Sequence, residues 1–143
     1  YRFMKKNNEN IKIIFFSTQN DDHFKKILTS FPESFSKKQI EKYSNLKDFS
    51  VAIRGVLFGS GVILIIIRNK KELNRVLQIA ERLKDHSVIL VLDESIDDLT
   101  QKALQLYPRY VSYFKDDYND IHLVLEKMIS KIQTTINGGN HVR

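Results

Sequence analysis

Carboxylates gathered in three short groups are the residues of this chain best suited to hold a metal ion or to move a proton. Nine of the 17 acidic residues belong to these groups: Asp21, Asp22, Asp93, Glu94, Asp97, Asp98, Asp116, Asp117 and Asp120. Carboxylate oxygens are preferred ligands of Mg²⁺ and Ca²⁺, but carboxylates are also common at helix N-termini, where they cap the first turn. The groups indicate either helix caps, which we favour, or a divalent-cation site with Asp21, Asp22 and Asp93 as candidate ligands.

Other catalytic arrangements have little support in the sequence. The chain has no cysteine, which excludes disulfides, thiolate metal sites and cysteine nucleophiles. A Ser-His-Asp triad can be drawn from Ser17, His23 and Asp93, but no nucleophile-elbow sequence is present. Metal-ligand spacing is absent among the four histidines, and we expect each to be an exposed helix or loop residue: His23, His86, His122 and His141. We therefore assign no catalytic residue and expect no enzyme activity.

The elements that would position these residues alternate between strands and helices. Four short apolar runs, residues 11–16, 62–67, 88–92 and 110–114, are continuous, as in parallel strands covered on both faces, and residues 39–43 are predicted to form a further short strand. Helical periodicity predicts helices between and after them: residues 21–30, 46–54, 73–83 and 121–132. The alternation favours an α/β fold with a doubly wound, five-stranded parallel sheet in the order 2-1-3-4-5.

Three of the helix starts carry a capping residue with an acid three positions later. The pairs are Asn69 with Glu72, Ser95 with Asp98, and Asp117 with Asp120. Such pairs satisfy the free amides of a first helical turn. We expect helices to begin at these three places.

A single domain is expected from the length of 143 residues and an ordinary hydrophobic content. We predict a domain over 10–133, a disordered or extraneous N-terminus over 1–9, and a flexible tail or linker over 134–143. The most apolar stretch, 51–67, is interrupted by an arginine, three glycines and a serine, so we expect no membrane span. With no signal-peptide core near the N-terminus, we expect a cytoplasmic protein.

The order of elements, the acid-rich loops after the strands and the segment ALQLYPRYVSYFKDDYNDIHLVLEKMI resemble the receiver domain of bacterial response regulators. This CheY-like domain of two-component and phosphorelay signalling shares its sheet with flavodoxins, and the likeness spans nearly all of 10–133. Receivers carry two magnesium-binding acids after strand one and a phosphoacceptor aspartate after strand three. They also carry a Ser or Thr after strand four and Lys-Pro after strand five. At the matching positions this chain has Ser17 and Thr18, Ile67 or Arg68, Leu92 or Asp93, and Lys115 followed by Asp116.

These departures imply a degenerate receiver that does not accept a phosphoryl group, because that transfer needs a carboxylate nucleophile and neutralising cations. Arg68 is expected either to pair with Asp93 at the end of the adjacent strand, fixing one state, or to be solvated. The resemblance implies a signalling role through a protein partner or a homodimer. We expect no cofactor, and we do not favour magnesium binding.

A partner surface is suggested by tyrosines around the last strand. In receivers the helix before that strand, the strand and the following helix carry dimerisation and output contacts. Tyrosine is also enriched at interfaces, and four of the six tyrosines lie here: Tyr107, Tyr110, Tyr113 and Tyr118. The alternative is that they only cover the edge of the sheet.

Three other functions were weighed against this one. A magnesium-dependent phosphoacceptor or small enzyme would use the acidic loops. Flavin binding is disfavoured, because Asp21 and Asp22 would repel a phosphate at the helix start. Nucleic-acid binding would use the basic N-terminal third with its aromatic residues: Lys5, Lys6, Lys12, Lys25, Lys26, Lys37, Lys38, Phe15, Phe16, Phe31 and Phe35. The phenylalanines, however, are at positions typical of a core.

Overall fold

The computed structural model describes residues 11–19, 22–29, 31, 39–56, 60–116 and 118–141, and only the backbone beyond residue 132. Its five strands are β1 Lys12–Phe16, β2 Ile40–Tyr43, β3 Gly61–Ile67, β4 Ser87–Leu92 and β5 Tyr110–Tyr113. They form one parallel sheet in the order β2-β1-β3-β4-β5. The predicted strands, their direction and their order are confirmed.

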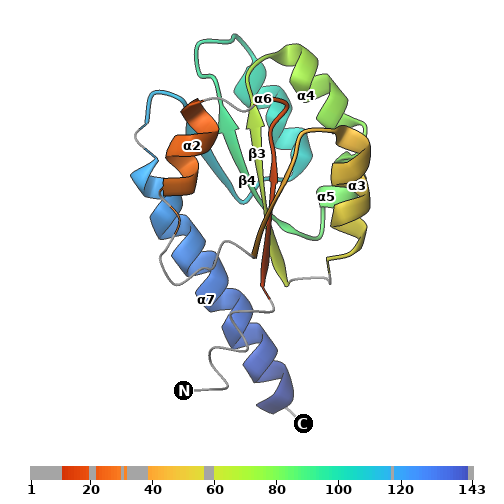
Figure 1. The fold of residues 1–143 in the computed structure, drawn as a ribbon, viewed down its shortest axis with the longest axis vertical. Helices are drawn as coiled ribbons and strands as arrows, with labels where there is room; N and C mark the ends of the chain where they lie inside the picture. The colour runs from red at the N-terminus through yellow and green to blue at the C-terminus, as the bar shows by residue number, and fades with distance from the viewer. Residues whose placement is uncertain are drawn as a thin grey trace.

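Helices cover both faces of the sheet (Figure 1). The helices are α2 Asp22–Thr29, α3 Leu46–Arg54, α4 Lys70–Leu77, α5 Ala80–Leu83, α6 Leu99–Ala103, the 3₁₀ helix η2 Leu104–Leu106, and α7 Asn119–His141. One core lies between the sheet and α3 to η2, and the other lies between the sheet and α2 with α7. Alternate residues of β3 point to the two cores, so Ile63 and Ile65 lie on one side and Val62 and Leu64 on the other.

Burial on both faces explains why the central strands lack polar alternation. Every residue of β3 and β4 is buried. A strand covered by helices on both sides needs apolar side chains at consecutive positions. This is the physical reason that these two strands could be identified from the sequence.

The helix predicted over 73–83 is divided. Helix α4 ends at Leu77 and α5 begins at Ala80, because the amides of Gln78 and Ile79 bond back three residues instead of four. The turn still leaves Leu83 buried in the same core as α4.

The helix after β4 begins later than predicted. Ser95 does not cap it; the amide and hydroxyl of Ser95 instead donate to Asp93 Oδ1 at 2.9 and 2.6 Å. The N-cap position of α6 is Asp98, in the left-handed region at φ 63° and without a side-chain capping bond. A local turn centred on Asp93 has taken the place of the predicted cap.

Helix α7 runs to His141, whereas the sequence predicted a polar tail from Thr134. No proline interrupts 119–141, and an established helix extends at little cost. Its last turns run past the edge of the sheet (Figure 1). Within the 51–67 stretch, residues 51–54 end α3 and residues 61–67 form β3, and no helix of the described residues is long and apolar enough to cross a membrane. The segment 1–9, Asp21, Asp117 and Phe35 lie outside the described residues.

Candidate functional site

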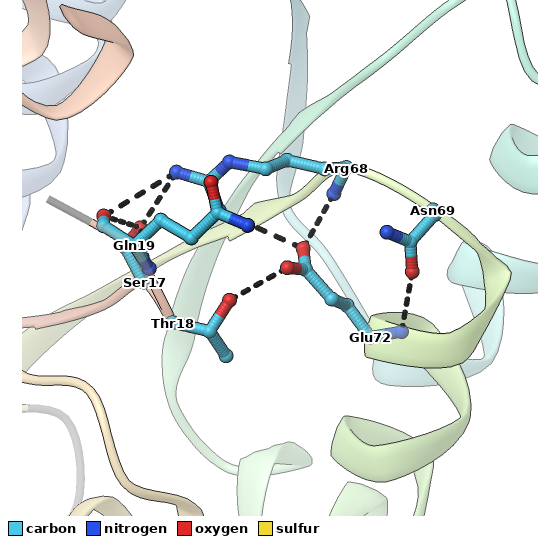
Figure 2. A network of polar contacts seen from close by, with 6 residues as sticks. All are labelled: Ser17, Thr18, Gln19, Arg68, Asn69 and Glu72. Carbon is cyan, nitrogen blue, oxygen red and sulfur yellow. Dashed lines mark hydrogen bonds and ion pairs between the residues drawn. The ribbon is translucent and has the colours of Figure 1, made fainter. Parts of the chain in front are cut away.

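The ends of β1 and β3 bring Ser17, Thr18 and Arg68 together at the carboxyl edge of the sheet (Figure 2). Arg68 Nη2 donates to Ser17 Oγ at 2.9 Å and to the carbonyl of Gln19 at 3.4 Å. Ser17 Oγ in turn donates to the Gln19 carbonyl at 2.7 Å. The guanidinium therefore reaches across from β3 to fix the turn that follows β1.

Glu72, in the first turn of α4, is the centre of this arrangement. Its Oε2 accepts a 2.6 Å bond from Thr18 Oγ1, and its Oε1 accepts a 2.8 Å bond from the Arg68 amide. Arg68 Nη1 lies 3.6 Å from the same Oε1, and the two side chains are only 12% and 11% exposed. We call Ser17, Thr18, Gln19, Arg68, Asn69 and Glu72 the Glu72 network (Figure 2).

Local sequence explains how Glu72 is turned inward. Asn69 is extended and its Oδ1 accepts from the Glu72 amide at 2.9 Å, which confirms Asn69 as the cap of α4. In a capping box the Glu carboxylate would return to the N-cap amide. Here the Glu72 carboxylate bonds to the Arg68 amide and to Thr18 instead. From the sequence Glu72 is expected only as part of a cap; its part in the site was not predicted.

Arg68 forms its ion pair with Glu72, so neither sequence expectation, an Asp93 pair or simple solvation, describes it. Asp93 at the end of β4 is engaged by Ser95. These hydrogen bonds from Ser95 lower the pKa of Asp93, and His23 nearby lowers it further. Asp93 is thus an ionised, partly exposed carboxylate beside the Glu72 network.

Lys115 lies after β5 as predicted, with an exposed side chain. Its backbone amide donates to Glu94 Oε1 at 2.8 Å, which ties the loop after β5 to the loop after β4. A shallow, open pocket nearby is lined by Tyr110, Lys115, Asp116 and Asp120.

Two histidines differ from the exposed positions expected of them. His23 stacks on Phe114 with ring centroids 3.9 Å apart, and its Nδ1 lies 2.6 Å from the Tyr118 hydroxyl. His86 is only 8% exposed, and burial lowers its pKa. Neither position carries a sequence signal, since each depends on how distant elements pack.

The four tyrosines of the predicted interaction face do not share one surface. Tyr118 is 1% exposed and belongs to the core, so it is not an interface residue. Tyr110 and Tyr113 are both half-buried and pack against opposite faces of the sheet. Tyr107 alone is well exposed, at 41%. Three positions separate Tyr110 from Tyr113, and the two-residue period of a strand sends them to opposite sides.

Candidate metal ligands are not gathered into a cluster in the part of the chain that the structure describes. Within it, no group of three or more His, Asp or Glu residues could hold a metal ion. Asp22 is exposed at the start of α2, while Asp93 is held by Ser95. The phenylalanines Phe15, Phe16 and Phe31 are buried, as their core-like pattern predicted, and do not offer rings for base stacking.

Comparison with known proteins shows the fold. No protein-family model matches the chain, and no curated protein matches it. A CheY-like protein, TadZ, from Pseudomonas aeruginosa PAO1 superposes with a TM-score of 0.63 at 15% identity, over 82% of this chain and 98% of that one. A pilus assembly-related protein from Burkholderia pseudomallei K96243 superposes with a TM-score of 0.59 at 11% identity, over 86% of this chain and 92% of that one. The chain therefore has the CheY-like fold, as the sequence resemblance implied.

Proposed function

We propose that this CheY-like domain is a non-enzymatic signalling and protein-interaction module that does not accept a phosphoryl group. The observation that carries the proposal is the position of Arg68. It stands at the end of β3, where a receiver presents its phosphoacceptor aspartate, and it is ion-paired to Glu72.

The chemistry of phosphoryl transfer argues against an acceptor here. Transfer to an aspartate needs a free carboxylate and a cation that neutralises the moving charge. Arg68 supplies no nucleophile, and its positive charge would repel a magnesium ion at the end of β3. The carboxylate in contact with Arg68, Glu72, already accepts bonds from Thr18 and Arg68.

The Glu72 network also favours one fixed state. A switch needs two conformations that a ligand or modification binds differently. Here the ends of β1 and β3 and the start of α4 are tied together by charged and neutral hydrogen bonds with little exposure. A domain held in this way would present a constant surface to a protein partner. One of the two similar structures is pilus assembly-related, and the assembly of a multi-protein machine is a setting in which such a module would serve.

The proposal is tested by incubation with acetyl phosphate and magnesium, followed by intact-mass measurement. We expect an unchanged mass, while a phosphoaccepting receiver treated in parallel gains one phosphoryl group. A stable single adduct would overturn the proposal. If that adduct disappeared in Asp93→Asn, the acceptor would be Asp93 and the domain a magnesium-dependent receiver.

A further inference from the structure

The outer face of α4 carries three cations and no exposed acid. Lys70, Lys71 and Arg75 are all exposed, and we call them the cationic face. The only acid of the helix, Glu72, is turned inward into the Glu72 network. In the described part of the chain, the ion pairs join Lys12 to Glu41, Arg68 to Glu72 and His122 to Glu126, and none involves the cationic face.

The cationic face is unfavourable for the isolated helix. Lys70 and Lys71 occupy the first turn, where the macrodipole disfavours positive charge. Lys71 and Arg75 are one turn apart, and like charges at that spacing repel each other. Residues that oppose local preference in this way often serve a function. We therefore expect the cationic face to bind an anionic partner.

Two exposed acids lie in the segment that leads into α6, the neighbour of α4, and we call Asp97 and Asp98 the acidic pair. They precede α6, which packs against α4, and β3 and β4, which lead into the two segments, are neighbours in the sheet (Figure 1). The acidic pair does not serve as a helix cap, because Asp98 is at the N-cap position without a side-chain capping bond. Among the described residues, neither carboxylate forms an ion pair.

We propose that the cationic face and the acidic pair form a self-complementary interface that binds a second copy of this chain. A two-fold axis between the two patches would set the cationic face of each copy against the acidic pair of the other. The proposal concerns self-association and holds whether or not the domain accepts a phosphoryl group.

Charge complementarity selects the second copy over other occupants. A nucleic acid or an anionic membrane would be attracted by the cationic face but repelled by the acidic pair beside it. Helix α4 also has no large exposed apolar side chain to insert into a membrane. Among the described residues, the exposed large apolar side chains lie outside α4: Val51, Leu104, Tyr107 and Leu123. A second copy matches both patches at once.

Sedimentation equilibrium from micromolar to millimolar protein concentration tests the proposal. We expect association at about 50 mM salt that weakens at about 500 mM, because exposed charges are screened over a few ångströms at high salt. Reversing one patch, with Lys70→Glu and Lys71→Glu, should weaken self-association roughly tenfold or more, because like charges then meet. Asp97→Lys combined with Asp98→Asn should do the same; asparagine is chosen because it tolerates the left-handed backbone at 98.

The decisive arm mixes the two variants. Each repels itself, but the acidic α4 of one variant matches the basic loop of the other, so association should return in the mixture. The matched control is Lys47→Glu with Arg54→Glu, which makes the same charge change on the exposed side of α3 and should associate like the unmodified chain. Thermal melts establish that every variant folds. A monomer under all conditions, an equal loss in the control, or no recovery on mixing would overturn the proposal.

Discussion

The hydroxyl of Thr18 donates a 2.6 Å hydrogen bond to Glu72 Oε2 across 54 positions of sequence. This bond joins the turn after β1 to the first turn of α4, at the edge where a receiver would bind magnesium and phosphate. The carboxylate that the site retains is therefore committed to structure. Removing the Glu72 carboxylate should therefore lower the free energy of unfolding.

Replacing Glu72 with alanine should lower the free energy of unfolding by about 3 kcal/mol, because it leaves the Arg68 charge with little exposure and without its carboxylate. Chemical denaturation measures the change. Glu81→Ala on the exposed side of α5 is the matched control and should stay within about 0.5 kcal/mol of the unmodified chain. Equal losses of unfolding free energy from the two substitutions would show that the Glu72 network does not stabilise the fold.

Gly61 at the start of β3 should not tolerate alanine. A Cβ there would lie 2.7 Å from Val56 Cγ1 and 3.1 Å from the Lys12 carbonyl oxygen. The clash with a stiff branched side chain and with backbone should cost roughly 1–3 kcal/mol. At Gly55 the nearest atom to a Cβ would be 3.5 Å away and φ is −80°, so Gly55→Ala should be neutral or stabilising by up to about 1 kcal/mol. Urea denaturation of both variants measures the changes in unfolding free energy. A Gly61→Ala variant as stable as the unmodified chain would contradict the close approach of Gly61 to Val56 and Lys12.

The fold could be predicted because its evidence is spread over many residues. The runs that became β3 and β4 are apolar at every position, and only a strand covered on both faces requires this. Helix α3 was predicted with its observed bounds, Leu46–Arg54, from one apolar stripe alone, and the structure adds Asn45 as its N-cap.

The site could not be predicted in the same way, because its details depend on single side-chain directions. Glu72 has the sequence context of a capping residue, and only the pairing of β1 with β3, which leads into α4, brings Thr18 within reach of it. Tyrosine is a residue type typical of interfaces, but Tyr118 has a φ of 65° and its ring is buried in the core with residues of α7 and α2. Tertiary contacts override local preference at both residues.

His86 should make the protein less stable in mild acid. Burial lowers its pKa in the folded state below the ordinary value of 6.5, so the unfolded chain binds the proton first. Its contribution to stability is therefore complete above about pH 6.5 and is lost as the pH falls toward the lower folded-state pKa. Thermal melts between pH 8 and 5, a span that covers the usual histidine range of about 6.6 ± 1, measure this loss. His86→Gln should reduce the pH dependence, whereas His122→Gln, at a partly exposed position on α7, should retain it.

Magnesium should leave thermal stability almost unchanged. Ligand linkage at a hundredfold excess over the dissociation constant would add about 2.7 kcal/mol, which a melting curve detects easily. We expect no such shift, because Asp93 is already held by Ser95 and Arg68 occupies the end of β3. An upward shift that vanished in Asp93→Asn would contradict this and indicate a cation site.

Tyr110 should ionise well above the ordinary tyrosine pKa in the folded protein. Its hydroxyl donates a 2.6 Å bond to Asp120 Oδ2, and this bond, with burial and the negative charge of Asp120, raises the pKa of Tyr110 to about 12. Because the unfolded chain loses this proton near pH 10, the contribution to stability is complete below that pH and is lost as the pH rises toward 12. Absorbance titration of the folded protein should show tyrosine ionisation near pH 12, and Tyr110→Phe should reduce the amplitude of that step by one phenol. The same substitution should lower stability at neutral pH by about 1.5–3 kcal/mol, the usual range for a hydrogen bond to a charged group. If the amplitude of the step near pH 12 were unchanged in Tyr110→Phe, the bond to Asp120 would not form in solution.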